Sequence, residues 1–131
     1  MKISSADNLK IKHLKKLQLK KYRREFGEFF VENLIIIKDA LRAGFKPISL
    51  YVSDDFLIKN EEEVQKIIKA SGLNDYFEIN ENINKSFSNL DNPSGIGAVY
   101  KTIKPKELKF NQSILYLNSI GDPGNLGAIF R

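Results

Sequence analysis

Short apolar segments alternate along this chain with longer amphipathic segments, and this alternation limits the folds that the chain can adopt. Strand patterns are expected at residues 28–32, 47–53, 76–79 and 96–103. Helix patterns are expected at residues 8–24, 34–43, 61–70 and 81–90. Such alternation is typical of a sheet that is covered by helices on both faces. The sequence therefore predicts an α/β fold, a small α/β/α sandwich.

Two of the helix patterns carry an expectation about packing. In residues 8–24 four apolar side chains share one arc, while Lys and Arg cover much of the rest of the helix. The four are Ile11, Leu14, Leu17 and Tyr22. Residues 34–43 are strongly apolar, so we expect this helix to belong to the core. Glycines suit the positions that follow the first three helices, and they are Gly27, Gly44 and Gly72.

The last eighteen residues combine an apolar run, a turn and the start of a helix. Residues 114–117 predict a strand. Pro123 fixes its own φ and Gly124 can adopt a positive φ, so a tight turn should follow. Asn125 then falls where the N-cap of a helix belongs, and the open helix end would favour an anionic group such as a phosphate. Arg131, six residues later, could flank the same pocket.

The length of this last segment suggests a second domain. A helix that starts so near the end of the chain is too short to be stable without a tertiary partner. The preceding strand would need a crossover connection of a dozen or more residues to gain a parallel neighbour. We therefore expect a first domain over residues 1–104, a charged linker over residues 105–112 and the start of a truncated second domain over residues 113–131. A lone strand leaves both edges unpaired, so residues 111–131 should be disordered, loosely packed on the first domain or paired with another copy.

Positive charge is concentrated near the N-terminus. The formal net charge is +5, and residues 1–24 carry about +8 while the rest of the chain carries about −3. A polyphosphate partner would use a local basic cluster of this kind. The candidate contacts to such a partner are Lys20, Lys21, Tyr22, Arg23 and Arg24. The alternative interpretation is the solvated face of an amphipathic helix.

Composition disfavours several other classes of site. The chain has no Cys, which excludes disulfides and thiolate zinc sites and is compatible with a reducing cytosol. The single histidine, His13, lies among lysines with no carboxylate or second His placed to help it, so we expect it to be solvated and expect no metal site. The clustered acidic residues look like a helix N-terminus, and they are Asp54, Asp55, Glu61, Glu62 and Glu63. No apolar run approaches the ~20 residues of a membrane span and no signal peptide is visible, which predicts a soluble, cytoplasmic protein.

The segment from Asp122 to Arg131 resembles the first signature motif of the SpoU-type, TrmH-like RNA 2′-O-ribose methyltransferases. These are knotted α/β enzymes that use S-adenosylmethionine. Upstream residues match the small substrate-binding domain that precedes the catalytic domain in many members, and they are Asn8, 20–23, Gly27, 29–32, 93–95, Ala98 and Val99. The resemblance covers essentially the whole chain. It departs from the family at Asn33, where members commonly have Gly.

The resemblance implies that the chain contains parts of two domains with different roles. The first would be similar to the kink-turn-binding ribosomal-protein fold and would grip RNA, which makes RNA the polyphosphate partner. The second would be the first strand, loop and helix of a truncated α/β-knot domain. The full-length protein would be a homodimer that uses S-adenosylmethionine, but the cofactor pocket cannot be assigned to residues of this chain. This part alone would then be inactive.

By the same resemblance, Asn125 would help to build the catalytic site and Arg131 would activate the ribose hydroxyl. A guanidinium group is effectively always protonated and has no lone pair with which to accept a proton. We therefore favour a role in which Arg131 holds a neighbouring phosphate and stabilises the negative charge that develops on the oxygen.

Two other interpretations stay open. The chain could be a stand-alone RNA-binding module that performs no catalysis. It could also bind a nucleotide through Gly121, Gly124 and Gly127, whose G-x-x-G-x-x-G spacing is neither the P-loop nor the dinucleotide fingerprint. The sequence does not distinguish ribosomal from transfer RNA as the substrate.

Overall fold

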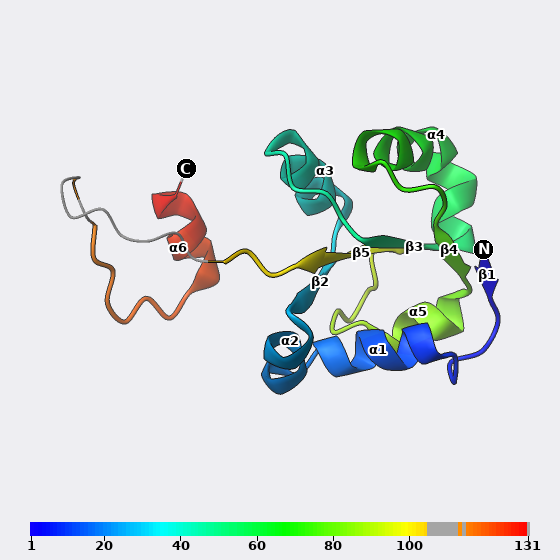
Figure 1. Ribbon diagram of the computed structural model, residues 1–131, viewed down its shortest axis with the longest axis horizontal. Helices are drawn as coiled ribbons and strands as arrows, with labels where there is room; N and C mark the ends of the chain where they lie inside the picture. The colour runs from blue at the N-terminus through cyan, green and yellow to red at the C-terminus, as the bar shows by residue number, and fades with distance from the viewer. Residues whose placement is uncertain (105–112, 114, 131) are drawn as a thin grey trace.

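A five-stranded mixed sheet forms the middle layer of the protein (Figure 1). The structure is a computed structural model that describes residues 1–104, 113 and 115–130. The strands, given in their order across the sheet, are β1 Lys2–Ile3, β4 Phe77–Ile79, β3 Ser49–Ser53, β5 Ile96–Lys101 and β2 Glu28–Glu32. β1, β4 and β3 run parallel to one another, whereas β5 is antiparallel to both β3 and β2. β2 therefore lies at one edge of the sheet.

Helices cover both faces of this sheet (Figure 1). On one side lie α1 Leu9–Leu17, α2 Lys20–Phe26 and α5 Glu81–Phe87, and on the other lie α3 Leu34–Arg42 and α4 Asp54–Ser71. Side chains alternate along the strands between two cores. On β3, Tyr51 joins the core beneath α1 and α5, while Leu50 and Val52 join the core beneath α3 and α4. The α/β arrangement predicted for the first part of the chain, with helices on both faces, is confirmed.

The first helix pattern forms two helices, which corrects the prediction of one helix over residues 8–24. α1 ends at Leu17 and α2 starts after Leu19, which is extended (φ −95°, ψ 130°). Nη1 of Arg23 donates hydrogen bonds to the backbone carbonyl of Leu17 at 2.9 Å and to that of Gln18 at 2.7 Å. These bonds satisfy carbonyl groups that the end of a helix leaves without partners. The apolar arc predicted for one helix is therefore divided between two.

α4 begins well before its predicted start, at Asp54. The hydroxyl of Ser53 accepts a hydrogen bond from the backbone N–H of Phe56 at 3.2 Å, which caps the helix. Asn60 has non-helical dihedral angles (φ −136°, ψ 28°) and marks a kink, beyond which the apolar periodicity becomes regular. The interpretation of the acidic residues as a helix N-terminus is confirmed for Asp54 and Asp55, which occupy the first turn.

α3 packs on the sheet with one face only, which corrects the expectation that it belongs to the core. Ile37 is fully buried, but Ile35 and Ile36 are 68% and 53% exposed. The side chain of Asn33 caps the helix by accepting hydrogen bonds from the backbone N–H groups of Ile35 and Ile36. A helix in an outer layer turns its far side to solvent even when that side is apolar.

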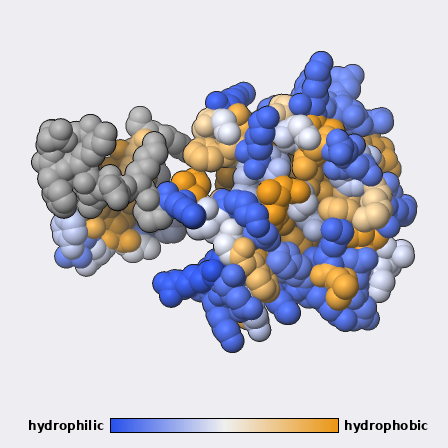
Figure 2. All heavy atoms as spheres, in the orientation of Figure 1, coloured by the Kyte–Doolittle hydropathy of each residue, from blue (hydrophilic) through white to orange (hydrophobic). Residues whose placement is uncertain are grey.

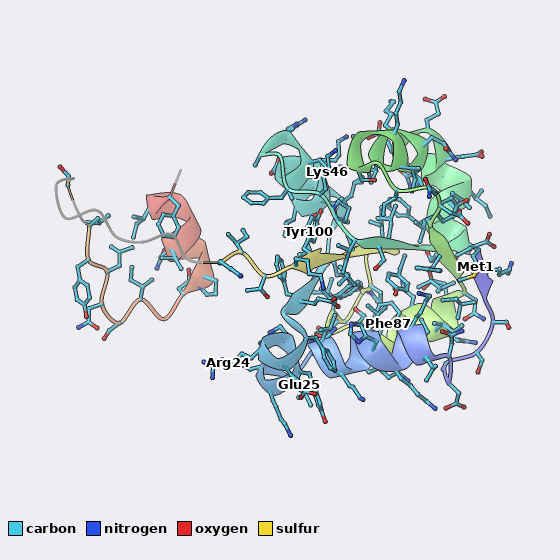
Figure 3. All side chains as sticks on the ribbon, in the orientation of Figure 1. Met1, Arg24, Glu25, Lys46, Phe87 and Tyr100 are labelled. Carbon is cyan, nitrogen blue, oxygen red and sulfur yellow. The ribbon has the colours of Figure 1, made fainter. Side chains whose placement is uncertain are left out.

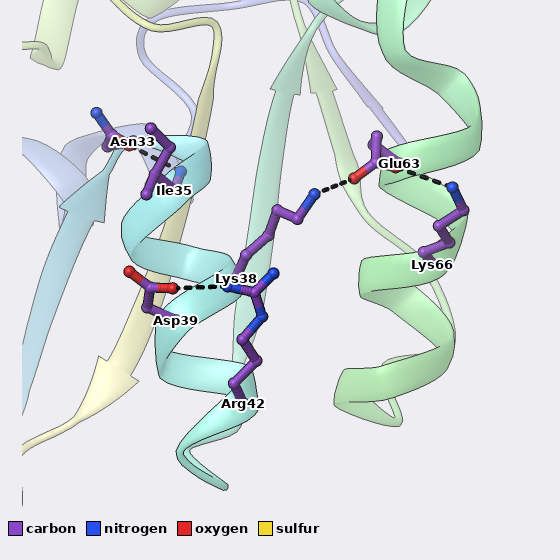
Figure 4. Close-up of polar contacts among 7 residues, drawn as sticks. All are labelled: Asn33, Ile35, Lys38, Asp39, Arg42, Glu63 and Lys66. Carbon is purple, nitrogen blue, oxygen red and sulfur yellow. Dashed lines mark hydrogen bonds and ion pairs between the residues drawn. The ribbon is translucent and has the colours of Figure 1, made fainter.

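Glu63 on α4 forms two ion pairs, one with Lys38 of α3 and one with Lys66 of its own helix (Figure 4). Its carboxylate oxygens lie 2.6 Å from Nζ of Lys38 and 2.9 Å from Nζ of Lys66. The hydrogen bonds from Lys38 and Lys66 lower the pKa of Glu63 to about 2. A carboxyl group whose pKa is lower in the folded state contributes stability above its unfolded pKa, and this contribution is lost as the pH falls through the folded pKa.

Replacing Glu63 with Gln should therefore destabilise the protein at neutral pH but not in acid. We expect a modest decrease in the urea midpoint at pH 7, because solvated ion pairs contribute little. The difference from wild type should shrink as the pH falls from the unfolded carboxyl pKa, about 4.5, towards 2. Urea titrations of both proteins, followed by circular dichroism at several pH values, would measure the difference between their midpoints. A difference that stays constant across this pH range would contradict the assignment.

The C-terminal segment differs from the predictions in three respects. Residues 115–117 form no strand. The helix in this segment, α6 Pro123–Ile129, is capped by Asp122, whose Oδ1 accepts a hydrogen bond from the backbone N–H of Asn125 at 2.7 Å, so Asn125 is not the N-cap. Gly124 lies within the helix and has no positive φ. Asp caps a helix as well as Asn does, and Pro is favoured at the first helical position, which explains the earlier start.

Figure 1 shows α6 beyond the end of β5, apart from both helix layers. The predicted linker at residues 105–112 and Ile114 lie outside the described residues, so the domain boundary stays a prediction. Within the described ranges, no helix combines the length and the apolar character that crossing a membrane requires.

Candidate nucleic-acid interface

The five residues predicted to bind a polyphosphate all lie on α2, at one corner of the domain. Lys20, Lys21 and Arg24 are exposed, whereas Tyr22 and Arg23 are half-buried. Figure 2 shows mainly hydrophilic side chains over this corner, and Figure 3 shows Arg24 extending away from the body of the domain. The structure therefore places the predicted residues together, and their contact with a ligand stays a prediction.

Tyr22 lies in a cluster of cations and aromatic rings. Nζ of Lys16 on α1 and Nζ of Lys21 on α2 each lie 5.5 Å from the centroid of its ring, within the range of a cation–π interaction. The ring also stacks on Phe26, with a centroid separation of 5.7 Å and an interplanar angle of 23°. In one continuous helix Lys16 and Tyr22 would lie on different faces. The break between α1 and α2 brings them together, and sequence reasoning missed Lys16 because it assumed no break.

An open groove of about 680 Å³ lies beside α2, where the helix meets the edge of the sheet. Its lining residues are Lys20, Arg23, Arg24, Gly27, Phe29 and Thr102. The backbone N–H of Thr102 donates to the carbonyl of Gly27 at 2.8 Å, which extends the pairing of β2 with β5 to this point. Cations from α2 and an aromatic ring from β2 thus face the same space. That combination suits the phosphate and the base of a nucleotide.

Arg23 contributes to the fold as well as to the charge of the groove. Its two hydrogen bonds to carbonyl groups at the end of α1 hold the corner between the helices. A guanidinium group has five N–H donors, so other donors stay available after these two bonds. Replacement of Arg23 would disturb the corner in addition to removing a charge, and a binding test should therefore leave it in place.

His13 pairs with a carboxylate, which corrects the expectation that it is solvated. Its Nε2 lies 2.8 Å from Oε2 of Glu28, whose side chain is 14% exposed, and Nζ of Lys101 lies 2.6 Å from Oε1 of Glu28. The His13 ring packs on Phe26 at a centroid distance of 4.8 Å. Burial alone would raise the pKa of Glu28, but the hydrogen bonds from Lys101 and His13 outweigh burial, so the pKa lies below its usual value. The sequence did not reveal this pair because only the packing of α1 on β2 brings the two residues together.

The residues predicted to be catalytic lie at the other end of the chain. Asn125 is exposed on α6, and Arg131 lies outside the described residues, so both roles stay predictions. Gly124 and Gly127 lie within α6, so these glycines do not form the phosphate-binding loop that the nucleotide interpretation requires. In the part of the chain that the structure describes, no three His, Asp or Glu side chains converge as a metal site would require. The surface of α1 and α2 is therefore the strongest candidate site.

Comparison with protein families finds a match between residues 8–98 and the MRM3-like substrate binding domain. The matched range includes α1 and α2 and extends into β5. It therefore contains the corner that carries the candidate site.

Two rRNA methyltransferases are similar to the chain in sequence. The chain is 29% identical over 129 residues to the Bacillus subtilis 23S rRNA (guanosine(2553)-2′-O)-methyltransferase RlmP, and the alignment covers 98% of this chain and 48% of RlmP. It is 30% identical over 118 residues to the mitochondrial rRNA methyltransferase 3 of Mus musculus, with 84% of this chain and 27% of that protein covered. The chain thus spans about half the length of the first relative and less of the second.

Solved structures of RNA methyltransferases are also similar to this chain. An RNA 2′-O ribose methyltransferase superposes with a TM-score of 0.74 at 30% identity, covering 98% of this chain and 50% of that one. The AdoMet-bound rRNA methyltransferase from Sinorhizobium meliloti superposes with a TM-score of 0.65 at 26% identity, covering 80% of this chain and 38% of that one. Both comparisons support the mixed α/β fold described above.

Proposed function

Because the chain belongs to the MRM3-like substrate-binding domain family, we propose that it is the RNA-binding part of an RNA 2′-O-ribose methyltransferase. Both sequence relatives are named as rRNA methyltransferases, which favours ribosomal over transfer RNA as the substrate. The observation that carries the proposal is the gathering of cations from α1 and α2 beside an aromatic ring and an open groove. The predicted cytoplasmic location stays part of the proposal.

The cations at this corner would supply affinity for the RNA backbone. Lys and Arg that neutralise phosphates release condensed counterions, so binding of this kind weakens steeply as the salt concentration rises. Such contacts position an RNA without reading its sequence. Tyr22 and Phe29 add aromatic surface on which bases can stack. The corner thus offers both kinds of contact that an RNA-binding surface needs.

The methyl transfer itself needs S-adenosylmethionine held in line with a ribose 2′-hydroxyl. We place the cofactor pocket in sequence that corresponds to the unaligned part of the relatives, one of which is an AdoMet-bound structure. In this proposal residues 1–104 hold the RNA, residues 105–112 are a linker and residues 113–131 begin the catalytic domain. Asn125 and Arg131 stay our candidates for catalytic roles, and the complete protein would be a homodimer. The present chain by itself would bind RNA without methylating it.

A binding assay on the present chain tests the proposal. Fluorescence anisotropy would follow a labelled rRNA hairpin across a series of salt concentrations, and calorimetry would measure S-adenosylmethionine binding separately. We expect RNA binding with a log–log salt slope of about −3 or steeper, and no heat from the cofactor. If the hairpin does not bind, the proposed RNA-binding role is wrong. Heat from S-adenosylmethionine would instead contradict the placement of the cofactor pocket.

A further inference from the structure

Tyr22 is an aromatic ring that neighbours support from several directions. Phe26 stacks on it, Lys16 approaches it from α1 and Lys21 approaches it from α2. Phe26 is in turn packed against His13, whose hydrogen bond to a β2 carboxylate ties this group of rings to the sheet. Tyr22 nevertheless keeps part of its surface exposed to solvent. A ring that is already held in place loses little conformational freedom when a ligand packs on it.

The two lysines beside the ring can give way to a base. Stacking of a base on an aromatic side chain contributes more to binding than an exposed cation–π contact does. Lys16 and Lys21 are both exposed, and a lysine carries its ammonium group on a flexible four-carbon stem. Each can therefore leave the ring and pair with the phosphate of the nucleotide whose base replaces it.

The base that stacks in this way must be unpaired. Within a duplex each base has neighbours on both faces, so an aromatic side chain cannot reach them. In loops and bulges the bases can be splayed out and stacked on aromatic rings. The groove lined by Lys20 and Arg24 lies on the other side of the same short helix, because each of these residues is two positions from Tyr22. Its cations would therefore contact phosphates beyond that nucleotide.

We propose that Tyr22 stacks on one unpaired base of the RNA, and that Lys16 and Lys21 bind the phosphate of the same nucleotide. The inference rests on the function proposed above and adds to it the form of RNA that this surface selects. It assigns Tyr22 the preference for unpaired nucleotides and leaves sequence-independent affinity to the cations of the groove.

Two RNAs and four variants test the inference. One RNA is a hairpin with 2-aminopurine in its loop, and the other is a duplex of equal charge with 2-aminopurine in a base pair. The proteins are the wild type, Tyr22→Phe, which keeps the ring, and Tyr22→Leu, which removes it. Phe45→Leu, at an exposed aromatic residue that follows α3, is the matched control. Circular dichroism would establish that each variant is folded.

We expect the wild type and Tyr22→Phe to quench the fluorescence of the loop 2-aminopurine. Tyr22→Leu should not quench it, and should bind the hairpin roughly 5- to 100-fold more weakly while its duplex affinity stays unchanged. Lys16→Gln with Lys21→Gln should make the salt slope for the hairpin shallower by about one, because the two lysines bind one phosphate.

Two other results would overturn the inference. Equal binding of the hairpin by wild type and Tyr22→Leu would remove Tyr22 from the interface while leaving the proposed function in place. If the wild type binds the hairpin without quenching its 2-aminopurine, Tyr22 is also removed from the interface. This result does not depend on whether Tyr22→Leu folds. If the wild type binds neither RNA, the proposed function itself fails.

Discussion

Neutralising Lys20, Lys21 and Arg24 together should weaken RNA binding roughly 10- to 100-fold at moderate salt and make the salt slope shallower by about two to three. The expectation follows from counterion release, since each phosphate contact contributes about 0.7 to 0.9 to the slope. All three side chains are exposed on α2 and line or adjoin the groove. The variant K20Q/K21Q/R24Q keeps Arg23, whose hydrogen bonds to α1 belong to the fold. Anisotropy titrations across a salt series would measure both quantities.

The control for this prediction removes the same amount of charge elsewhere. Lys46, Lys59 and Lys69 are exposed on the side of the sheet covered by α3 and α4. K46Q/K59Q/K69Q should leave the salt slope almost unchanged, because these residues lie away from the proposed interface. Equal losses in the two triple variants would show that only net charge matters, and the α2 surface would lose its special role.

Gly97→Ala should destabilise the domain by ~2–3 kcal/mol, which is the largest effect on stability that we expect from the addition of one methyl group. Gly97 lies on β5 opposite Glu32 of β2, where the Phe30 ring crosses directly over it. A Cβ atom at this position would lie 2.2 Å from Cζ of Phe30. That ring cannot move freely, because it packs edge-on against Phe87 at 5.5 Å and Tyr51 at 6.5 Å. Thermal unfolding should show a decrease in Tm on the order of 10 °C.

A second substitution separates the steric clash from other effects of the alanine. Phe30→Leu removes the ring atoms that the new methyl group would meet, so Gly97→Ala should cost less in that background than in the wild type. Additive losses in the double variant would mean that Phe30 is not the cause. Because Phe29 lies on β2 and Thr102 directly follows β5, Gly97→Ala should also weaken RNA binding under conditions in which the domain is partly unfolded.

The elements of the first domain followed largely from local patterns. The glycines predicted to follow helices have positive φ values of 62°, 84° and 76°, and they are Gly27, Gly44 and Gly72. Two of the four predicted strands begin at their predicted starts, and the other two begin within two residues of theirs. Local propensity and turn chemistry suffice for such features, because each depends on a few neighbouring residues.

Features that depend on tertiary contacts were not predictable in the same way. The break after Leu17 has no Gly or Pro to mark it and is held by a side chain, Arg23, that lies beyond it. β1 has only two residues and exists because β4 pairs with it. The apolar run at the start of α3 also hid which face would meet solvent, since Ile35 and Ile36 share the exposed side with Lys38, Asp39 and Arg42. The partner of β1 is distant in the sequence, and the break after Leu17 depends on a side-chain contact that propensity does not show.

The candidate site likewise combines residues that local sequence could identify with contacts that only the fold creates. The basic residues of α2 could be identified from charge alone, because charge is visible residue by residue. The contribution of Lys16 to the Tyr22 cluster and the pairing of His13 with Glu28 could not, since both depend on how α1 meets α2 and β2. The family resemblance supplied the substrate class, and the structure supplied the arrangement that we propose recognises it.

Photo-crosslinking tests most directly whether the domain holds RNA at the corner of α1 and α2. A hairpin with 4-thiouridine in its loop would be irradiated in complex with the present chain, and mass spectrometry would identify the cross-linked peptides. We expect cross-links within residues 16–29, with Tyr22 the main site, and their loss in the presence of excess unlabelled hairpin. Cross-links confined to α4, or to the exposed apolar face of α3 at Ile35 and Ile36, would contradict the account, because RNA would then occupy a different surface of the same fold.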